Sequence, residues 1–100
     1  MSRSELRLRD AAELDLENAL AWYAERNPEL AQRLLNDLDV AYSRILESPK
    51  QFPIIARDVR RVLLTHFPYG VYYVPHPDRI DVVAILHLMR HPDAWRQRDR

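Results

Sequence analysis

The stretch from Val59 to Trp95, VRRVLLTHFPYGVYYVPHPDRIDVVAILHLMRHPDAW, decides the fold. It contains three short runs rich in β-branched and aromatic residues, and proline-containing turns separate them. Runs of this kind at this spacing predict an antiparallel meander of strands. The predicted strands are Val59–His66, Val71–Val74 and Arg79–Leu88. Most candidate functional side chains also fall in this stretch, so we expect the first half of the chain to serve mainly as packing for the sheet.

The chain before this stretch begins with a predicted strand and a predicted helix. Across Ser4–Arg9, two leucines alternate with charged residues, which is the period of a strand with one buried face. Apolar residues then recur at helical spacing over Asp10–Arg26. Asp10 with Glu13 three residues later resembles a capping box, so we place the start of the helix there.

A second helix is predicted between Asn27-Pro28 and Ser48-Pro49. Asparagine is a favoured N-cap, proline is favoured at the first helical position, and Pro49 cannot continue a helix. The apolar spacing of the first helix is repeated here. We therefore expect a helical hairpin whose two apolar faces lie on the same side of the sheet.

Two connections complete the prediction. Lys50–Asp58 reads as a loop, and Phe67–Gly70 reads as a turn between strands. Gly70 is the only glycine in the chain, so we expect it to take a positive φ in that turn.

These elements give an α+β fold, a two-layer sandwich of order β-α-α-β-β-β, with the N-terminal helical hairpin packed on an antiparallel sheet. At 100 residues, we expect one domain spanning residues 1–100. The sheet face away from the helices would be open and able to bind a partner.

Composition excludes several classes of function. The chain has no cysteine, so disulfides and thiolate metal sites are absent. The charged start MSRSELRLRD does not resemble a signal peptide, and no apolar run is long enough to span a membrane. We expect a cytoplasmic protein without a membrane partner. The net charge of zero conceals a polarity, since residues 1–49 hold six arginines and ten acidic groups while residues 50–100 hold nine basic and five acidic groups.

His87 is the first candidate for chemistry. Simple alternation along Arg79–Leu88 separates Ile80, Val82, Ala84 and Leu86 from Asp81, Val83, Ile85 and His87. If the first set meets the helices, His87 points to the open face, where it could act as an acid or base near neutral pH. The alternative is a surface or partner-contact histidine.

Three arginines are the candidates that would accompany it. Arg60 and Arg61 are neighbours on one strand, so one of them should reach the open face and clamp a phosphate or an acidic partner. Their alternative role is to discourage edge pairing between sheets. Arg90 follows His87 by three residues and could complete a small basic site.

Metal and cofactor sites are not expected. His87 and His91 are four residues apart, but the first is predicted on a strand and Pro92 follows the second, so helical zinc-ligand geometry does not apply. The tyrosines of the meander suit strand packing better than base stacking. Trp95 reads as a lid that fastens the polar C-terminal tail to the body.

The sequence resembles the RelE/ParE superfamily of toxins from type II toxin–antitoxin modules over nearly its whole length. The resemblance rests on AELDLENALAWY at 12–23, ESPKQFP at 47–53, RRVLLTHFPYGVYY at 60–73 and ILHLMRHPDAW at 85–95. It implies a toxin neutralised by a cognate antitoxin, which wraps it with a segment that folds on binding, giving a hetero-oligomer. Trp22, as a possible anchor, and Trp95 are the candidate partner-binding residues.

Within the superfamily, RelE-like members cleave mRNA on the ribosome and ParE-like members poison DNA gyrase. The chain lacks the lysine pair and the C-terminal tyrosine of RelE-like members, so the resemblance favours a gyrase poison over an enzyme. In the alternative, an endoribonuclease, His87 would move a proton while Arg60 or Arg61, with Arg90, stabilises the phosphate. A third alternative is a non-toxic relative that only binds antitoxin.

Overall fold

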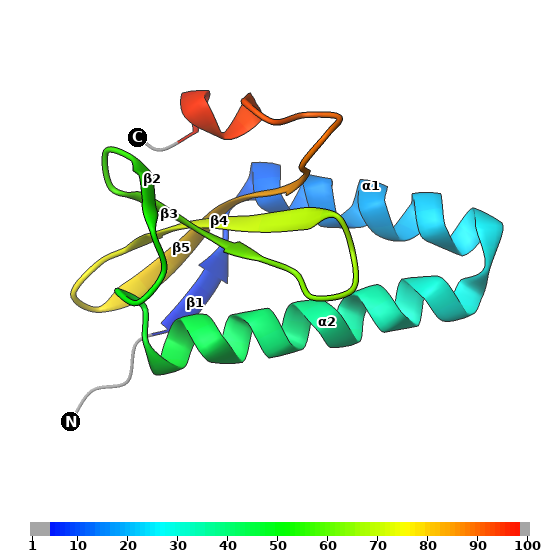
Figure 1. The fold of residues 1–100 in the computed structure, drawn as a ribbon, viewed down its shortest axis with the longest axis horizontal. Coiled ribbons are helices and arrows are strands. Elements are labelled where there is room, and N and C mark those ends of the chain that lie inside the picture. Colours follow the sequence, from blue (N-terminus) through cyan, green and yellow to red (C-terminus); the bar gives the residue numbers. More distant parts are fainter. Residues whose placement is uncertain (1–4, 99–100) are drawn as a thin grey trace.

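The computed structural model describes residues 5–98 of the chain. Its elements are β1 (Glu5–Leu8), α1 (Asp10–Arg26), α2 (Pro28–Glu47), β2 (Ile54–Ala56), β3 (Val59–Leu63), β4 (Tyr69–Pro75), β5 (Arg79–His87) and the 3-10 helix η1 (Ala94–Gln97). The two helices form an antiparallel hairpin along one side of the molecule (Figure 1). The α+β class and the predicted order are confirmed, with the short β2 added before the last three strands.

The sheet is mixed, whereas an antiparallel sheet was expected. Its strand order is β1-β5-β4-β3-β2, and β1 pairs parallel with β5 while the other neighbours are antiparallel. The helical hairpin carries the chain from one edge of the sheet to the other (Figure 1). That path leaves β1 beside the last strand, running in the same direction.

The main core lies between the helices and one face of the sheet. It combines Ala12, Ala19, Tyr23, Leu34, Leu38, Ala41 and Ile45 of the helices with Val62, Val71, Tyr73, Ile80, Val82 and Ile85 of the strands. Both leucines of β1 pack against this core, as the alternation predicted. The hairpin therefore buries its apolar stripe on the sheet, which is the source of most helix stability in proteins.

Helix capping follows the prediction at one helix and not at the other. Asn27 alone joins the helices, and its Oδ1 accepts a hydrogen bond from Glu29 N at 3.0 Å, as expected of an N-cap. The capping box at Asp10 is wrong, because Asp10 is already helical and the N-cap is Arg9, whose side chain makes no cap bond. Asp10 instead places a negative charge in the first turn, where the helix dipole favours it.

The predicted loop Lys50–Asp58 contains a strand. Ile54–Ala56 pairs with the start of β3 and forms the edge of the sheet. The tight reversal that follows places Arg57 at a φ of 51°. The segment contains two isoleucines, which favour strands. Its pairing gives hydrogen-bond partners to the backbone groups of β3 that point away from β4.

Gly70 does not take a positive φ, so that prediction is wrong. It lies inside β4, which begins two residues earlier than expected. A Cβ on Gly70 would approach Arg61 Cδ and Tyr72 Cε1 to 3.2 Å each. Close packing against these two side chains, rather than a turn, distinguishes the position of the glycine.

A β-bulge in β5 reverses the facing of its last residues. Tyr72 pairs with Ala84 and Tyr73 pairs with Val82, so Val83 has no partner in β4. Ile80 and Val82 face the helices before the bulge, and Ile85 faces them after it, while Ala84 and Leu86 face the other way. The predicted grouping of Ala84 and Leu86 with the helix-facing residues is therefore wrong.

The second face of the sheet is partly covered instead of open. A smaller cluster there contains Val59, Tyr72, Val74, Val83, Ala84, Leu86 and Trp95. The tail folds back so that η1 lies on the other side of the sheet from α2 (Figure 1). The Trp95 ring stacks on Tyr72 with centroids 5.8 Å apart and an interplanar angle of 16°. The predicted lid role of Trp95 is confirmed.

Candidate functional site

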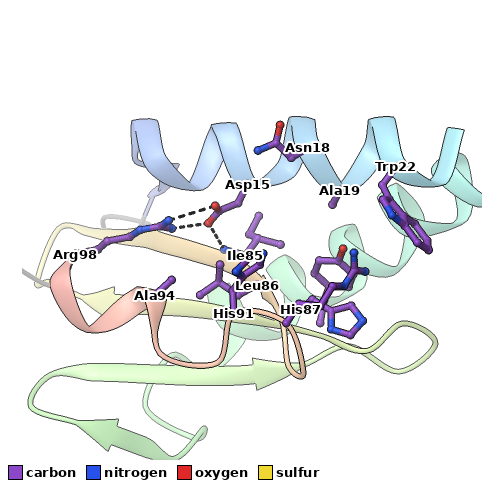
Figure 2. A pocket seen from close by; sticks show the side chains of 12 residues that line it. Asp15, Asn18, Ala19, Trp22, Ile85, Leu86, His87, His91, Ala94 and Arg98 are labelled. Atoms are coloured by element: carbon purple, nitrogen blue, oxygen red, sulfur yellow. Dashed lines mark hydrogen bonds and ion pairs between the residues drawn. The ribbon is translucent and has the colours of Figure 1, made fainter. Parts of the chain in front are cut away.

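A pocket of about 290 Å³ lies between α1 and the last residues of β5. We call it the α1–β5 groove, and its lining residues are Asp15, Asn18, Ala19, Trp22, Tyr69, Ile85, Leu86, His87, Arg90, His91, Ala94 and Arg98. Figure 2 shows the α1 side chains on one side, those of β5 and the tail on the other, Asp15 with Arg98 at one end and Trp22 at the other.

The Asp15 end is closed by hydrogen bonds to the sheet edge. β1 stops at the pair Leu8–Val82, so the later part of β5 has no neighbouring strand on that side. Asp15 Oδ2 accepts the backbone N–H of Ile85 at 3.0 Å and also bonds the Arg98 guanidinium (Figure 2). Two charged side chains thus stand where a longer β1 would have paired with the backbone groups of β5.

The Trp22 end carries stacked arginines. The guanidinium carbon of Arg26 lies 3.3 Å from the Trp22 ring centroid, and that of Arg90 lies 4.7 Å from it. Trp22 remains 36% exposed. Among the residues that the structure describes, neither arginine forms an ion pair. This end of the groove is a cationic and aromatic surface with no internal counter-charge.

His87 lies in the groove wall, and its surroundings favour the neutral imidazole. Its Nδ1 accepts the backbone N–H of Met89 at 3.1 Å, which assigns the proton of the neutral ring to Nε2. Its ring meets Tyr69 edge-on with centroids 5.3 Å apart. Burial, followed by the charges of Arg90 and His91, holds the pKa of His87 below its ordinary value.

Tyr69 is the neighbouring side chain, one of the tyrosines for which the sequence favoured packing over base stacking. Burial and the nearby Tyr23 raise its pKa, while the charge and hydrogen bond of Arg90 act in the opposite direction. Its hydroxyl therefore stays protonated at neutral pH and provides a fixed polar group beside Arg90.

The four residues proposed for a phosphate site do not come together. His87 and Arg90 share the groove, and His87 lies on the helix side of the sheet rather than the open face because of the bulge at Val83. Arg60 faces the helix side at another place, where its Nη1 donates to the carbonyls of Lys50 (3.0 Å) and Phe52 (2.7 Å).

Of the two neighbouring arginines, Arg61 is the one that reaches the second face of the sheet. The sequence alone did not decide between Arg60 and Arg61. Its guanidinium carbon lies 6.0 Å from the Tyr72 ring centroid, and its stem passes over Gly70. Arg60 and Arg61 are therefore on opposite sides of the sheet, as alternation required, and Arg61 is separated from His87 by the sheet itself.

The two tryptophans have different surroundings. Trp22 is at the surface of the groove, whereas Trp95 is 5% exposed and donates from Nε1 to Pro92 O at 2.9 Å. Partner contact remains a prediction for both residues, and only Trp22 presents its ring in this state of the molecule.

Sequence reasoning missed Asp15 and Arg98. Their side chains meet across 83 residues of sequence, and neither belongs to a local motif. The only hint was that Asp15 interrupts the apolar side of a helix, which is a weak signal because charged residues border most helical stripes.

A second pocket, of about 560 Å³, lies along the outer side of α2. We call it the α2 groove, and it is lined by Leu30, Arg33, Asn36, Asp37, Val40, Thr65, His66 and Phe67. Its Asp37 is buried and accepts the backbone N–H of His66 at 2.9 Å. That carboxylate holds the β3–β4 connection against α2, so it has a structural role in the groove.

Within residues 5–98, no three His, Asp or Glu side chains gather as metal ligands would. Neither α1 nor α2 is both long and apolar enough to cross a lipid bilayer, judged over the same described residues.

Comparison with known proteins identifies the family. The model of the ParE toxin of type II toxin–antitoxin systems, parDE, matches residues 6–92. The chain belongs to the ParE toxin family. Toxin ParE2 from two strains of Mycobacterium tuberculosis, CDC 1551 / Oshkosh and ATCC 25618 / H37Rv, is 33% identical over 90 residues, covering 89% of this chain and 86% of each relative.

The fold is also seen in a solved structure. A chain of the chromosomal ParDE toxin–antitoxin system from P. aeruginosa superposes with a TM-score of 0.74, at 19% identity, over 85% of this chain and 96% of that one. The family model and the ParE2 relatives confirm the predicted membership of the RelE/ParE superfamily. This ParE-family chain is a type II toxin, and its family implies an antitoxin partner and a toxin–antitoxin hetero-oligomer.

Proposed function

We propose that this ParE-family toxin acts in the cytoplasm by binding DNA gyrase, and that it does not cleave RNA. The observation that carries the proposal is the hydrogen bond from Met89 N to His87 Nδ1. His87 is the side chain at the end of β5 that the sequence singles out for acid–base work. That bond and its cationic neighbours restrain it in the neutral form.

Proton transfer at His87 is disfavoured in both directions. To act as a base, Nδ1 would have to release the Met89 N–H, and the imidazolium formed would lie beside Arg90 and His91. To act as an acid, the ring would have to carry the second proton that these neighbours disfavour. A general acid or base works best with a pKa near the operating pH, and this site moves the pKa away from it.

Phosphate stabilisation is disfavoured as well. Convergent cations are needed around a scissile phosphate, yet Arg60 is committed to two backbone carbonyls and Arg61 lies across the sheet. Action through protein–protein contact requires neither group and suits the exposed tryptophan and arginine residues, which are enriched at protein interfaces.

The test uses purified toxin with DNA gyrase and, separately, with translating ribosomes. We expect inhibition of supercoiling and accumulation of cleaved gyrase–DNA complexes, with intact mRNA in the ribosome reaction. His87→Ala should retain the gyrase effect within about threefold, as should the groove control His91→Ala, because neither ring transfers a proton.

Ribosome-dependent mRNA cleavage that His87→Ala abolishes, with its circular dichroism and melting temperature unchanged, would overturn this proposal in favour of the endoribonuclease. Absence of both effects would identify the chain as a non-toxic binder of antitoxin.

A further inference from the structure

We propose that the α2 groove binds an amphipathic helix of the toxin's protein target, with apolar side chains of that helix against Val40 and Phe67 and an acidic side chain at Arg33. The inference rests on the proposed function, under which the target is DNA gyrase. It adds the surface of the toxin that makes the contact.

The two walls of the α2 groove are held at a fixed spacing. One wall is the α2 stripe from Leu30 to Val40, whose members recur at helical spacing. The other wall is the β3–β4 connection, which Asp37 fastens to α2 because its Oδ2 accepts the His66 N–H at 2.9 Å. A groove built in this way is formed before its partner arrives, so binding loses little conformational entropy.

The apolar side chains of the groove lie where a partner can reach them. Val40 is 54% exposed. Phe67 is partly buried, and its ring meets Tyr23 of α1 edge-on with centroids 5.1 Å apart. Tyr23 also contacts the Trp22 ring, with centroids 4.8 Å apart, so a chain of ring contacts links the groove to the exposed tryptophan. Val40 and Phe67 therefore offer fixed apolar contacts to the side chains of a partner.

The backbone of the walls selects a helical occupant over an extended one. An extended segment gains affinity by pairing with free backbone groups at a sheet edge. Here Tyr69 N donates to Phe67 O at 2.8 Å, and Leu64 N donates to Tyr69 O at 2.9 Å. His66 N is bound by Asp37, and α2 bonds its own backbone internally. A partner helix likewise satisfies its own backbone and needs only side-chain contacts. The α2 stripe is about 15 Å long, which matches a helix of about three turns.

The charges of the groove favour an acidic partner. Arg33 is exposed, and it forms no ion pair within residues 5–98. Of the described residues that line the groove, only Asp37 carries a carboxylate, and it is buried and bound to a backbone N–H. Glu29 and Asp39 belong to α2 but lie outside the lining. A guanidinium beside an apolar surface binds carboxylates through forked, charge-assisted hydrogen bonds.

The test measures binding of purified full-length toxin variants to the DNA gyrase holoenzyme by biolayer interferometry, with inhibition of supercoiling as a second readout. Val40→Glu and Arg33→Glu should each raise the dissociation constant at least about tenfold. The first places a charge on the apolar floor, and the second repels the acidic side chain of the partner. Leu14→Glu is the matched control, because Leu14 is 56% exposed on α1 and lines neither groove. It should change the dissociation constant less than about twofold.

The binding kinetics separate the two contacts. Arg33→Glu should mainly slow association, and its effect should shrink as the salt concentration rises, because a rim charge acts on the encounter of the partners. Val40→Glu should mainly speed dissociation, because it disrupts a contact made only in the complex. Both side chains are exposed, so the variants should fold, and circular dichroism with thermal unfolding checks this.

Four results would overturn the inference. If the wild type binds and inhibits gyrase and both groove variants do so equally well, the inference falls while the proposed function stands. If the wild type does not bind gyrase, both fall. Loss of antitoxin affinity in Val40→Glu, with gyrase affinity unchanged, would assign the groove to the antitoxin. Self-association of the toxin that Val40→Glu abolishes, again with gyrase affinity unchanged, would assign it to a second copy.

Discussion

At Asp81, a carboxylate only 5% exposed is held by arginines from two segments far apart in the chain. Its Oδ2 accepts from Arg9 Nη2 at 3.2 Å and its Oδ1 from Arg79 Nε at 3.1 Å. Burial alone would raise the pKa of Asp81, but the hydrogen bonds and charges of the two arginines outweigh it and hold the pKa below its ordinary value. The ionised carboxylate therefore ties β5 to the junction of β1 and α1.

Asp81→Asn should lower the free energy of unfolding at pH 7 by about 1–3 kcal/mol, because charged hydrogen bonds to two arginines are lost. Because the folded pKa is depressed, this contribution is present above the ordinary aspartate pKa of about 3.9 and is lost as the pH falls through the folded value. Urea unfolding should show that the difference in free energy of unfolding between wild type and Asp81→Asn is smaller at pH 3 than at pH 7. An equal difference at both pH values would contradict the ion-pair explanation.

Gly70→Ala tests the explanation of the only glycine. The added methyl group would meet Tyr72 Cε1, and Tyr72 is fixed beneath Trp95, so we expect destabilisation of about 1 kcal/mol from overpacking. The flexible Arg61 can move aside, so Arg61→Ala in the same chain should recover only part of the loss. Thermal unfolding of the single and double variants measures both effects, and an unchanged or higher melting temperature for Gly70→Ala would refute the close-packing account.

At the scale of elements, short-range sequence patterns predicted the helices and the main strands, because neighbouring residues determine where these form. The Asn27-Pro28 cap and the apolar stripes placed both helices, and the β-branched runs placed β3, β4 and β5. The bulge escaped prediction because residues 82–86 read VVAIL, which is apolar in either facing, so nothing in the pattern marks the extra residue. The position of His87 depended on that one residue.

Alanine variants of Trp95 and Trp22 should have different effects, the first mainly on the free energy of unfolding and the second mainly on antitoxin binding. Trp95→Ala removes a buried ring from the second-face cluster and should lower the free energy of unfolding by about 3 kcal/mol or more. Trp22→Ala removes a partly exposed ring and should cost less than half as much, while it weakens antitoxin binding. Urea unfolding and antitoxin titration of both variants provide the measurement. Equal stability losses would show that Trp95 does not act as the lid described above.

At the scale of the whole molecule, contacts between distant segments build the candidate site. Asp15 and Arg98 meet across 83 residues, and the groove combines an early helix with the C-terminal tail. Composition along the chain indicated a negative first half and a positive second half but not where they touch. Only the three-dimensional path of the chain, with β1 beside β5, brings them together.

The same path separates the residues that a ribonuclease would need to bring together. Arg61 is on one side of the sheet, and His87 with Arg90 is on the other. What remains on the groove side is a neutral histidine and a stacked tryptophan and arginine surface suited to protein contact. This arrangement supports the proposal that the toxin acts through protein contact.

Pulse expression of the toxin without antitoxin, with DNA and protein synthesis followed separately by label incorporation, tests that action most directly. We predict that DNA synthesis falls first, and that His87→Ala reproduces the same order. If protein synthesis fell first while DNA synthesis continued, and His87→Ala removed the effect, the proposal of action through protein contact would be contradicted.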